Sequence, residues 1–180
     1  MDFTTRFVHE EVKTSDEMVS FPLREVVSSL MYLVTFTQPD ISFAIVLLSR
    51  FVNQPSNKHV GAVKRVLRYL ASTLNYGLTY QRRYGSTSQI VIDVFSDSDW
   101  GGDPDTRRSV TGVLFNLASG SVSWLSRSQS FVGLSTDEAE YIATCEADME
   151  AASLCNIFEE ILYARNKSIA VELVSITRAQ

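Results

Sequence analysis

A series of short apolar runs in the second half of the chain limits the folds that are open to it. Ile90–Ser96 alternates apolar and polar residues and is rich in β-branched side chains, as expected of a half-buried strand. Thr111–Ala118, Ser121–Arg127 and Phe131–Leu134 are further short runs joined by Gly- and Ser-containing connections. Because sequential strands with tight connections pair with one another, the sequence predicts an antiparallel meander.

A long helical pattern follows these strands. Ser135 and Glu138 have the spacing of a capping box, in which side chains satisfy the first free N–H groups of a helix. The helix is expected to run to about Tyr163. Its predicted inner face consists of Ala139, Ile142, Ala143, Ala147, Leu154, Ile157, Phe158, Ile161 and Leu162. Ile169–Ile176 then alternates as a strand does, so the fold class is α/β, with a mixed sheet and one long helix.

The first half of the chain predicts short helices separated by prolines. Pro22 is placed to open a helix. The apolar positions of this helix are Val26, Val27, Leu30, Leu33 and Val34. Pro39 breaks the pattern, and Asp40 is placed to cap a second helix that runs from Phe43 to Val52.

The third predicted helix, from about Lys58 to Ser72, is basic. Its buried stripe is expected to contain Val60, Val63, Val66, Leu67 and Leu70. Lys64 and Arg68 lie one turn apart on another face. A phosphate-binding surface and an ordinary solvated face both fit this pattern. The sequence contains no Gly-rich phosphate loop, so it predicts no nucleotide site.

The formal net charge of −5 hides a strong separation of charge along the chain. Residues 41–92 contain seven Lys and Arg and no acid, whereas residues 93–163 contain thirteen acids and three Arg. A basic block beside an acidic one indicates two modules. We therefore expect a helical segment at residues 1–89 and an α/β domain at residues 90–180, joined by the polar stretch Gln81–Gln89.

Composition excludes several classes of protein. A chain of 180 residues with 45% hydrophobic residues can bury a core without disulfides and is too apolar to be disordered. The apolar stretch Leu30–Phe36 is far shorter than the ~18 residues of a membrane span, and the first twenty residues have no signal-peptide core. Cys145 and Cys155 lie roughly 15 Å apart along the predicted helix, so they cannot bond to each other. The acidic balance makes nucleic acid an unexpected partner.

Two acidic positions are expected at one end of the predicted sheet. Asp97, or Asp99, follows the first strand, and Glu140 lies in the first turns of the long helix. Carboxylates that come from two different elements can hold a hard divalent cation. A solvated turn and ordinary surface glutamates are the simpler explanation of the same residues. The two histidines, His9 and His59, lie in the other half, so no Ser–His–Asp triad can be assembled.

The sequence around these acids resembles a known family. The run FSDSDWGGDPDTRRSVTGVLFNLASGSVSWLSRSQSFVGLSTDEAEYIA is similar to the RNase H domain of copia-type retrotransposon polyproteins. The segments SSLMYLVTFTQPDISFAIVLLSRF and AVKRVLRYLASTLNYGLTY resemble the preceding region, at the tail of the reverse transcriptase. The resemblance spans roughly Val26–Leu162. It implies an RNase H-like fold, with Asp97 and Glu140 at the positions of the first two catalytic carboxylates.

The same resemblance implies that the chain is not an enzyme. In the family a third catalytic Asp ends the strand that follows the helix, and the best register puts Ile176 there. The fourth acid would fall beyond Gln180, and the paired aspartates of the polymerase palm are absent. Two-metal catalysis needs carboxylates that hold two ions about 3.5–4 Å apart. We therefore expect Asp97 and Glu140 to be a vestigial metal pair, with no cofactor.

A second resemblance lies in the basic helix. Arg65, Val66, Leu67 and Arg68 match RxLR, the host-translocation motif of secreted oomycete effectors. A retroelement-like body with this motif resembles the RxLR effectors of downy mildews, which bind host proteins inside plant cells and dampen immunity and cell death. The resemblance thus implies a secreted, non-catalytic protein that acts inside the host cell on host plant proteins, without a membrane or nucleic-acid partner.

Alternative interpretations stay open at this point. The motif is also explained structurally, as two arginines that flank a buried Leu67, because the copia family has KRxLRYL at this helix. The chain as a whole is alternatively an intracellular RNase H-like nuclease that uses Mg²⁺, as a polyprotein fragment, or a remnant without function.

Overall fold

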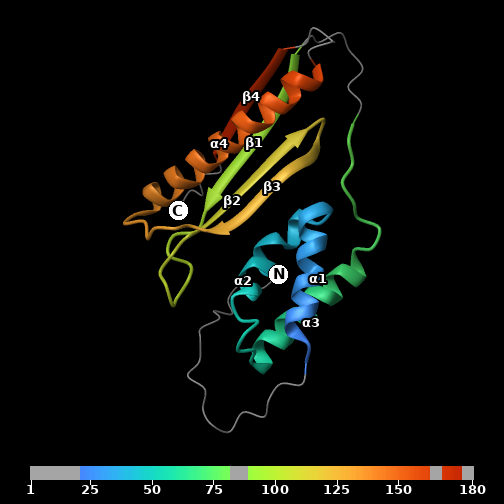
Figure 1. The fold of residues 1–180 in the computed structure, drawn as a ribbon, viewed down its shortest axis with the longest axis vertical. Coiled ribbons are helices and arrows are strands. Elements are labelled where there is room, and N and C mark those ends of the chain that lie inside the picture. Colours follow the sequence, from blue (N-terminus) through green and yellow to red (C-terminus); the bar gives the residue numbers. More distant parts are fainter. Residues whose placement is uncertain (1–20, 82–88, 163–167, 176–180) are drawn as a thin grey trace. The chain divides into compact units, whose positions relative to one another are not determined.

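A computed structural model describes residues 21–81, 89–162 and 168–175 of the chain (Figure 1). The chain divides into two compact units, which we call the helical unit and the sheet unit. The helical unit comprises Met1–Gly77 and Pro104–Thr106, and the sheet unit comprises Leu78–Asp103 and Arg107–Gln180. Both helix and strand are present in a mixed arrangement, which confirms the α/β class.

The division between the units falls after Gly77, before the boundary that we expected between residues 89 and 90. Hydrogen bonds explain the position. The Tyr80 hydroxyl donates to the Ser121 carbonyl oxygen at 2.7 Å, and the Gln81 N–H donates to the Ala118 carbonyl oxygen at 2.8 Å. Residues 80 and 81 are thereby attached to the sheet unit. Residues 82–88 of the predicted linker lie outside the described residues.

The helical unit contains α1 (Leu23–Phe36), the 3₁₀ turn η1 (Pro39–Ile41), α2 (Ser42–Ser49) and α3 (Asn57–Ser72). The apolar faces of the helices meet in one core. The buried core residues are Leu23, Val27, Leu30, Val34, Ile41, Ile45, Leu48, Val60, Val63 and Val66. The i, i+3/i+4 spacing of these residues puts them on one side of each helix, so burial of apolar surface stabilises the unit.

Two details of the helical unit differ from the sequence expectation. Asp40 does not cap α2, because the N-terminus of that helix has no side-chain cap. The Asp40 carboxylate instead accepts a hydrogen bond from the Tyr69 hydroxyl of α3. The second helix ends at Ser49 rather than at Val52. The Ser49 hydroxyl donates to the Val46 carbonyl oxygen at 2.7 Å, a local bond that competes with continued helix.

The sheet unit is a four-stranded sheet in the order β3-β2-β1-β4. The strands are β1 (Gln89–Ser98), β2 (Val110–Leu117), β3 (Gly120–Ser128) and β4 (Ser168–Ser175). β1, β2 and β3 form the predicted antiparallel meander, and β4 returns parallel to β1. The crossover between β3 and β4 is the long helix α4 (Thr136–Leu162), which lies across one face of the sheet (Figure 1).

Four alanines at four-residue spacing form the contact face of α4. Ala139, Ala143, Ala147 and Ala151 are all at most 7% exposed, and the last two pack in the core with the sheet. The expectation that Ile157 and Ile161 are buried is wrong, because they are 50% and 64% exposed. Residues four apart advance about 40° around a helix of 3.6 residues per turn. The contact face therefore rotates along α4 and leaves these two isoleucines in solvent.

The segment Phe131–Leu134 is not the strand that the sequence predicted. β3 ends at Ser128, and residues 129–135 form an irregular connection to α4. Its geometry is fixed instead by a side chain, because the indole N–H of Trp100 donates to the Gly133 carbonyl oxygen at 3.0 Å. Among the described residues, no helix has the length and apolar character that crossing a bilayer requires.

Candidate functional site

The RxLR-like residues lie on α3, whose start is fixed by an unusual capping box. The Ser56 N–H donates to Nδ1 of His59 at 3.0 Å, and the Ser56 side chain caps the first turn. The His59 ring is buried and stacks on Phe51, with ring centroids 4.2 Å apart. His59 therefore has a structural role at the start of α3.

The four residues of the RxLR-like sequence divide between core and surface. Val66 is 1% exposed and packs in the core of the helical unit. Arg65, Leu67 and Arg68 are exposed. The expectation that Leu67 is buried is wrong, because 40% of its surface is accessible. Val60, Val63 and Val66 complete the buried stripe at a three-residue spacing, and Leu67 lies a further 100° around the helix. The three defined positions of the motif thus face solvent, and only its variable position is buried.

Positive charge is concentrated on the exposed side of α3. The helix contains Lys58, Lys64, Arg65 and Arg68 and no acidic residue. The Arg68 Nε–H donates to the Lys64 carbonyl oxygen at 3.3 Å, which holds its guanidinium along the helix. Lys64 Nζ lies 5.8 Å from the centroid of the Phe21 ring. α3 therefore has a cationic exposed face, and its opposite face packs in the core of the helical unit.

Asp97, the first expected carboxylate, lies near the end of β1 opposite Gly112 of β2. Its neighbour Ser96 is buried, and alternate residues of a strand point to opposite faces, so Asp97 lies on the other face. Its Oδ1 accepts a hydrogen bond from the Ser98 N–H at 2.9 Å. The side chain is partly buried.

Asp99 has a structural role in the turn after β1. Its Oδ1 accepts a hydrogen bond from the Val110 N–H. Burial raises the pKa of Asp99, the neighbouring charges of Asp97 and Asp103 raise it further, and the Val110 hydrogen bond opposes the change. A Cβ at Gly102 would lie 1.8 Å from the Asp99 Oδ2, so a larger residue there would displace the Asp99 carboxylate from the turn. The acid-rich sequence after β1 is thus largely explained by the turn.

Glu140, the second expected carboxylate, lies in the second turn of α4 and is partly buried. The residue before it, Ala139, faces the sheet. Within the described ranges, no group of three or more His, Cys, Asp or Glu side chains is arranged to hold a metal ion. No described contact joins Asp97 to Glu140, so their pairing stays an untested prediction. Ile176, the expected replacement of a third Asp, lies outside the described residues.

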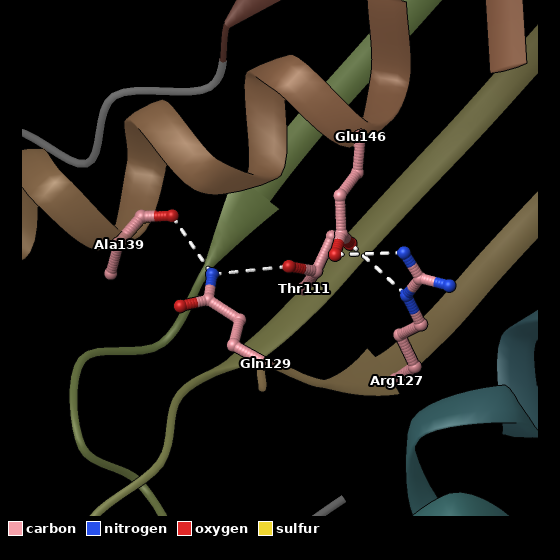
Figure 2. A network of polar contacts seen from close by, with 5 residues as sticks. All are labelled: Thr111, Arg127, Gln129, Ala139 and Glu146. Carbon is pink, nitrogen blue, oxygen red and sulfur yellow. Dashed lines mark hydrogen bonds and ion pairs between the residues drawn. The ribbon is translucent and has the colours of Figure 1, made fainter. Parts of the chain in front are cut away.

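A buried polar network that the sequence did not predict joins the sheet to the start of α4. Figure 2 shows the Gln129 side chain between Thr111 of β2 and Ala139 of α4. Its Nε2 donates to Thr111 Oγ1 at 3.1 Å and to the Ala139 carbonyl oxygen at 2.9 Å. Gln129 is 0% exposed, although a Gln in a Ser-rich stretch has the sequence character of a surface residue. No sequence signal distinguishes it.

A bidentate ion pair lies beside this network (Figure 2). Arg127 Nη2 is 2.8 Å from Glu146 Oε1, and Arg127 Nε donates to Glu146 Oε2 at 3.3 Å. The hydrogen bonds and charge of Glu146 raise the pKa of Arg127. Gln129 and Arg127 together attach α4 to the β3 side of the sheet, which positions the helix that carries Glu140.

Known proteins match this chain over most of its length. The Pol polyprotein of transposon TNT 1-94 from Nicotiana tabacum is 39% identical over 83% of the chain, and that of transposon RE1 from Arabidopsis thaliana is 39% identical over 77%. Secreted RxLR effector protein 161 of Plasmopara viticola is 45% identical over 76% of the chain and 94% of its own length. The chain belongs to this copia-derived family. The family resemblance inferred from the sequence is therefore confirmed.

Members of the copia-derived family differ greatly in length. The chain covers 11% of the TNT 1-94 polyprotein and 9% of the RE1 polyprotein, in contrast to nearly all of the Plasmopara protein. No protein-family profile and no solved structure matches the chain.

Proposed function

We propose that the protein is a non-catalytic, retroelement-derived effector of the RxLR type, which is secreted, enters plant host cells and suppresses host cell death or immunity. One observation carries the proposal. The chain is 45% identical to a secreted RxLR effector over 94% of that protein, while the same region is only about a tenth of the polyproteins. A short protein of this family with an effector role is therefore a direct precedent.

The surface of α3 supports the proposal. Arg65, Leu67 and Arg68 are accessible on a folded helix, so a receptor can contact all three without unfolding it. Val66 anchors the same turn in the core. Substitution of the three exposed residues should leave the helical unit folded, because surface changes outside caps and cores usually alter stability by about 0.5 kcal/mol or less.

The acidic positions support a role without catalysis. Asp97 and Glu140 are the two carboxylates that match the catalytic positions of the RNase H resemblance, and the sequence has Ile176 in the expected place of the third. Two carboxylates without a third acid bind a pair of Mg²⁺ ions weakly. The proposed activity is therefore binding to a host plant protein, with no cofactor, and the acidic sheet unit disfavours nucleic acid as the partner.

An assay of cell death in leaves tests the proposal. Leaf cells that express the full chain and are then challenged with a cell-death elicitor should show less necrosis than cells with an empty vector. A triple variant, Arg65→Ala, Leu67→Ala and Arg68→Ala, should still suppress necrosis when it is made inside the leaf cell. The same variant should lose suppression when it is delivered by the pathogen, because the motif is proposed to act in translocation.

Lys64→Ala is the matched control, since it removes a neighbouring exposed cation of α3 outside the motif. It should behave as the unchanged chain in both forms of delivery. If Lys64→Ala and the triple variant lost suppression of necrosis equally after delivery by the pathogen, translocation would depend on general positive charge. That result would contradict a motif-specific role.

The similarity to transposon polyproteins favours a second candidate function, an RNase H-like nuclease. Asp97 and Glu140 are retained, and the TNT 1-94 polyprotein matches 83% of the chain. Hydrolysis of an RNA–DNA hybrid that requires Mg²⁺ and is lost in Asp97→Asn would establish this alternative. Absence of both hydrolysis and suppression of cell death would indicate a remnant without either function.

A further inference from the structure

The connection between β3 and α4 exposes three large apolar side chains. Phe131, Val132 and Leu134 are 73%, 49% and 86% exposed. Trp100, in the connection between β1 and β2, is 50% exposed and bonds to Gly133 in the middle of this segment. We call these four side chains the apolar loop surface. Grouped exposed apolar side chains are typical of interaction sites, because they gain free energy when a partner removes them from water.

Hydrogen bonds fix the shape of the apolar loop surface. The Trp100 indole N–H donates to the Gly133 carbonyl oxygen at 3.0 Å, and the Leu134 N–H donates to Glu138 Oε2 at 2.7 Å. The Glu138 N–H donates to Ser135 Oγ at 3.2 Å, which completes the start of α4. Gly133 is buried against Ala139, where an added Cβ would lie 3.5 Å from the alanine Cβ. A loop ordered in this way loses little entropy on binding.

The surroundings of the apolar loop surface are acidic. Asp137 and Glu138 are exposed in the first turn of α4, and α4 carries eight acids and no Lys or Arg. The β1–β2 connection that carries Trp100 also contains the exposed Arg107, whose guanidinium lies near Gly101, and Arg108. An apolar patch in an acidic field favours a partner whose apolar residues are accompanied by Lys and Arg.

We propose that Trp100, Phe131, Val132 and Leu134 form a docking surface for a basic amphipathic segment of a partner protein. This inference rests on the proposed function, in which the chain binds a host protein, and it names the surface and the chemistry of that partner. The apolar side chains of the segment cover the four exposed residues. Its cations lie against Asp137 and Glu138 at the start of α4, so charge complementarity selects a basic segment over an acidic one.

The test uses the full chain and a synthetic amphipathic helix with Leu on one face and Lys on the other. Isothermal titration calorimetry should detect binding, and a peptide with Glu in place of every Lys should not bind. The double variant Phe131→Ser and Leu134→Ser should bind the Lys peptide about tenfold or more weakly, because two large apolar contacts are lost. Asp137→Asn should weaken binding and make it less sensitive to salt.

Leu74→Ser is the matched control, because Leu74 is 81% exposed and belongs to the helical unit. It should leave the affinity unchanged. Equal binding of the Lys and Glu peptides, or unchanged affinity in the double variant, would overturn the proposal. Sedimentation that shows self-association lost only in the double variant would also overturn it, since a second copy would then be the occupant. Peptide binding without suppression of leaf cell death would contradict the proposed function while supporting this surface.

Discussion

The amide nitrogen of Gln129 donates to the Thr111 hydroxyl at 3.1 Å in a site from which water is excluded. The same nitrogen donates to the Ala139 carbonyl oxygen at 2.9 Å (Figure 2). One side chain therefore connects β2, the end of β3 and the first turn of α4. This connection holds the first turn of α4, and with it Glu140, against the sheet.

Substitution Gln129→Ala should destabilise the sheet unit by about 1–3 kcal/mol, because it removes both Nε2 hydrogen bonds and leaves a cavity in the packed interior. The loss stays moderate because the Gln129 Oε1 is itself buried without a hydrogen-bond partner and disappears with the side chain. Urea unfolding followed by circular dichroism measures the change. Gln81→Ala is the control, since the Gln81 side chain is exposed and its hydrogen bond to Ala118 uses the backbone N–H. If Gln129→Ala lowered the free energy of unfolding no more than Gln81→Ala, the polar network around Gln129 would not stabilise the sheet unit.

Glycine at position 120 is required by close packing rather than by backbone conformation. A Cβ at Gly120 would lie 2.5 Å from Tyr80 Cδ1 and 2.6 Å from the Thr79 carbonyl oxygen. Gly120→Ala should therefore displace residues 79–81 and cost about 1–3 kcal/mol in thermal or urea unfolding.

Gly61 provides the opposite case. An added Cβ at this exposed position of α3 meets nothing within 4 Å. Gly61→Ala should stabilise the helical unit by about 0.5–1 kcal/mol, because alanine is the better helix former. If Gly61→Ala and Gly120→Ala destabilised the protein by similar amounts, close packing around Gly120 would not be the cause of the loss in Gly120→Ala.

The contact between Tyr69 and Asp40 predicts that the helical unit loses stability at alkaline pH. The hydrogen bond to the Asp40 carboxylate is the main cause that raises the pKa of Tyr69, and burial and the Asp40 charge add to it. A raised folded-state pKa contributes stability that is complete below the ordinary tyrosine value of about 10 and is lost as pH rises through the raised value.

Near-ultraviolet absorbance of tyrosinate, compared with the Tyr69→Phe variant, should show that Tyr69 ionises at higher pH than an ordinary tyrosine. Asp40→Asn keeps an acceptor oxygen but removes the charge, so it should lower the pKa of Tyr69. The contact has no electrostatic role if Tyr69 titrates identically in the chain and in Asp40→Asn.

Catalysis by the sheet unit should be absent. With Mg²⁺ or Mn²⁺ present, the chain should cleave an RNA–DNA hybrid no faster than Asp97→Asn, because two carboxylates do not clamp two ions. Gel electrophoresis of labelled hybrid measures the rate. Cleavage that depends on metal and on both Asp97 and Glu140 would contradict a non-catalytic role.

Much of the fold follows from periodic sequence patterns. The apolar spacing of α1 and α3 and the alternation of β1, β2 and β3 predicted these elements, because a helix or strand that buries one face repeats its apolar residues with its own period. The capping box at Ser135 and Glu138 predicted the start of α4. One detail differs from a standard capping box, because the Glu138 carboxylate accepts from the Leu134 N–H and not from the Ser135 N–H.

The sequence predictions that were wrong concern segments whose structure depends on tertiary contacts. Phe131–Leu134 has strand-like composition, but the Trp100 indole binds its carbonyl, and no ladder partner is available beyond Ser128 among the described strands. Ile157 and Ile161 lie at apolar positions of the helical pattern, but the contact face of α4 rotates past them. The candidate carboxylates Asp97 and Glu140 came from the family resemblance, and their pairing stays a prediction.

We propose that this member of the copia-derived family acts in the plant cell by binding rather than by catalysis. The most direct measurement is necrosis in leaves that express the full chain and receive a cell-death elicitor, with Asp97→Asn and Phe131→Ser/Leu134→Ser beside it. We expect the full chain and Asp97→Asn to reduce necrosis equally and the double variant to reduce it less. Undiminished necrosis with the full chain, or suppression that requires Asp97, would contradict a binding role.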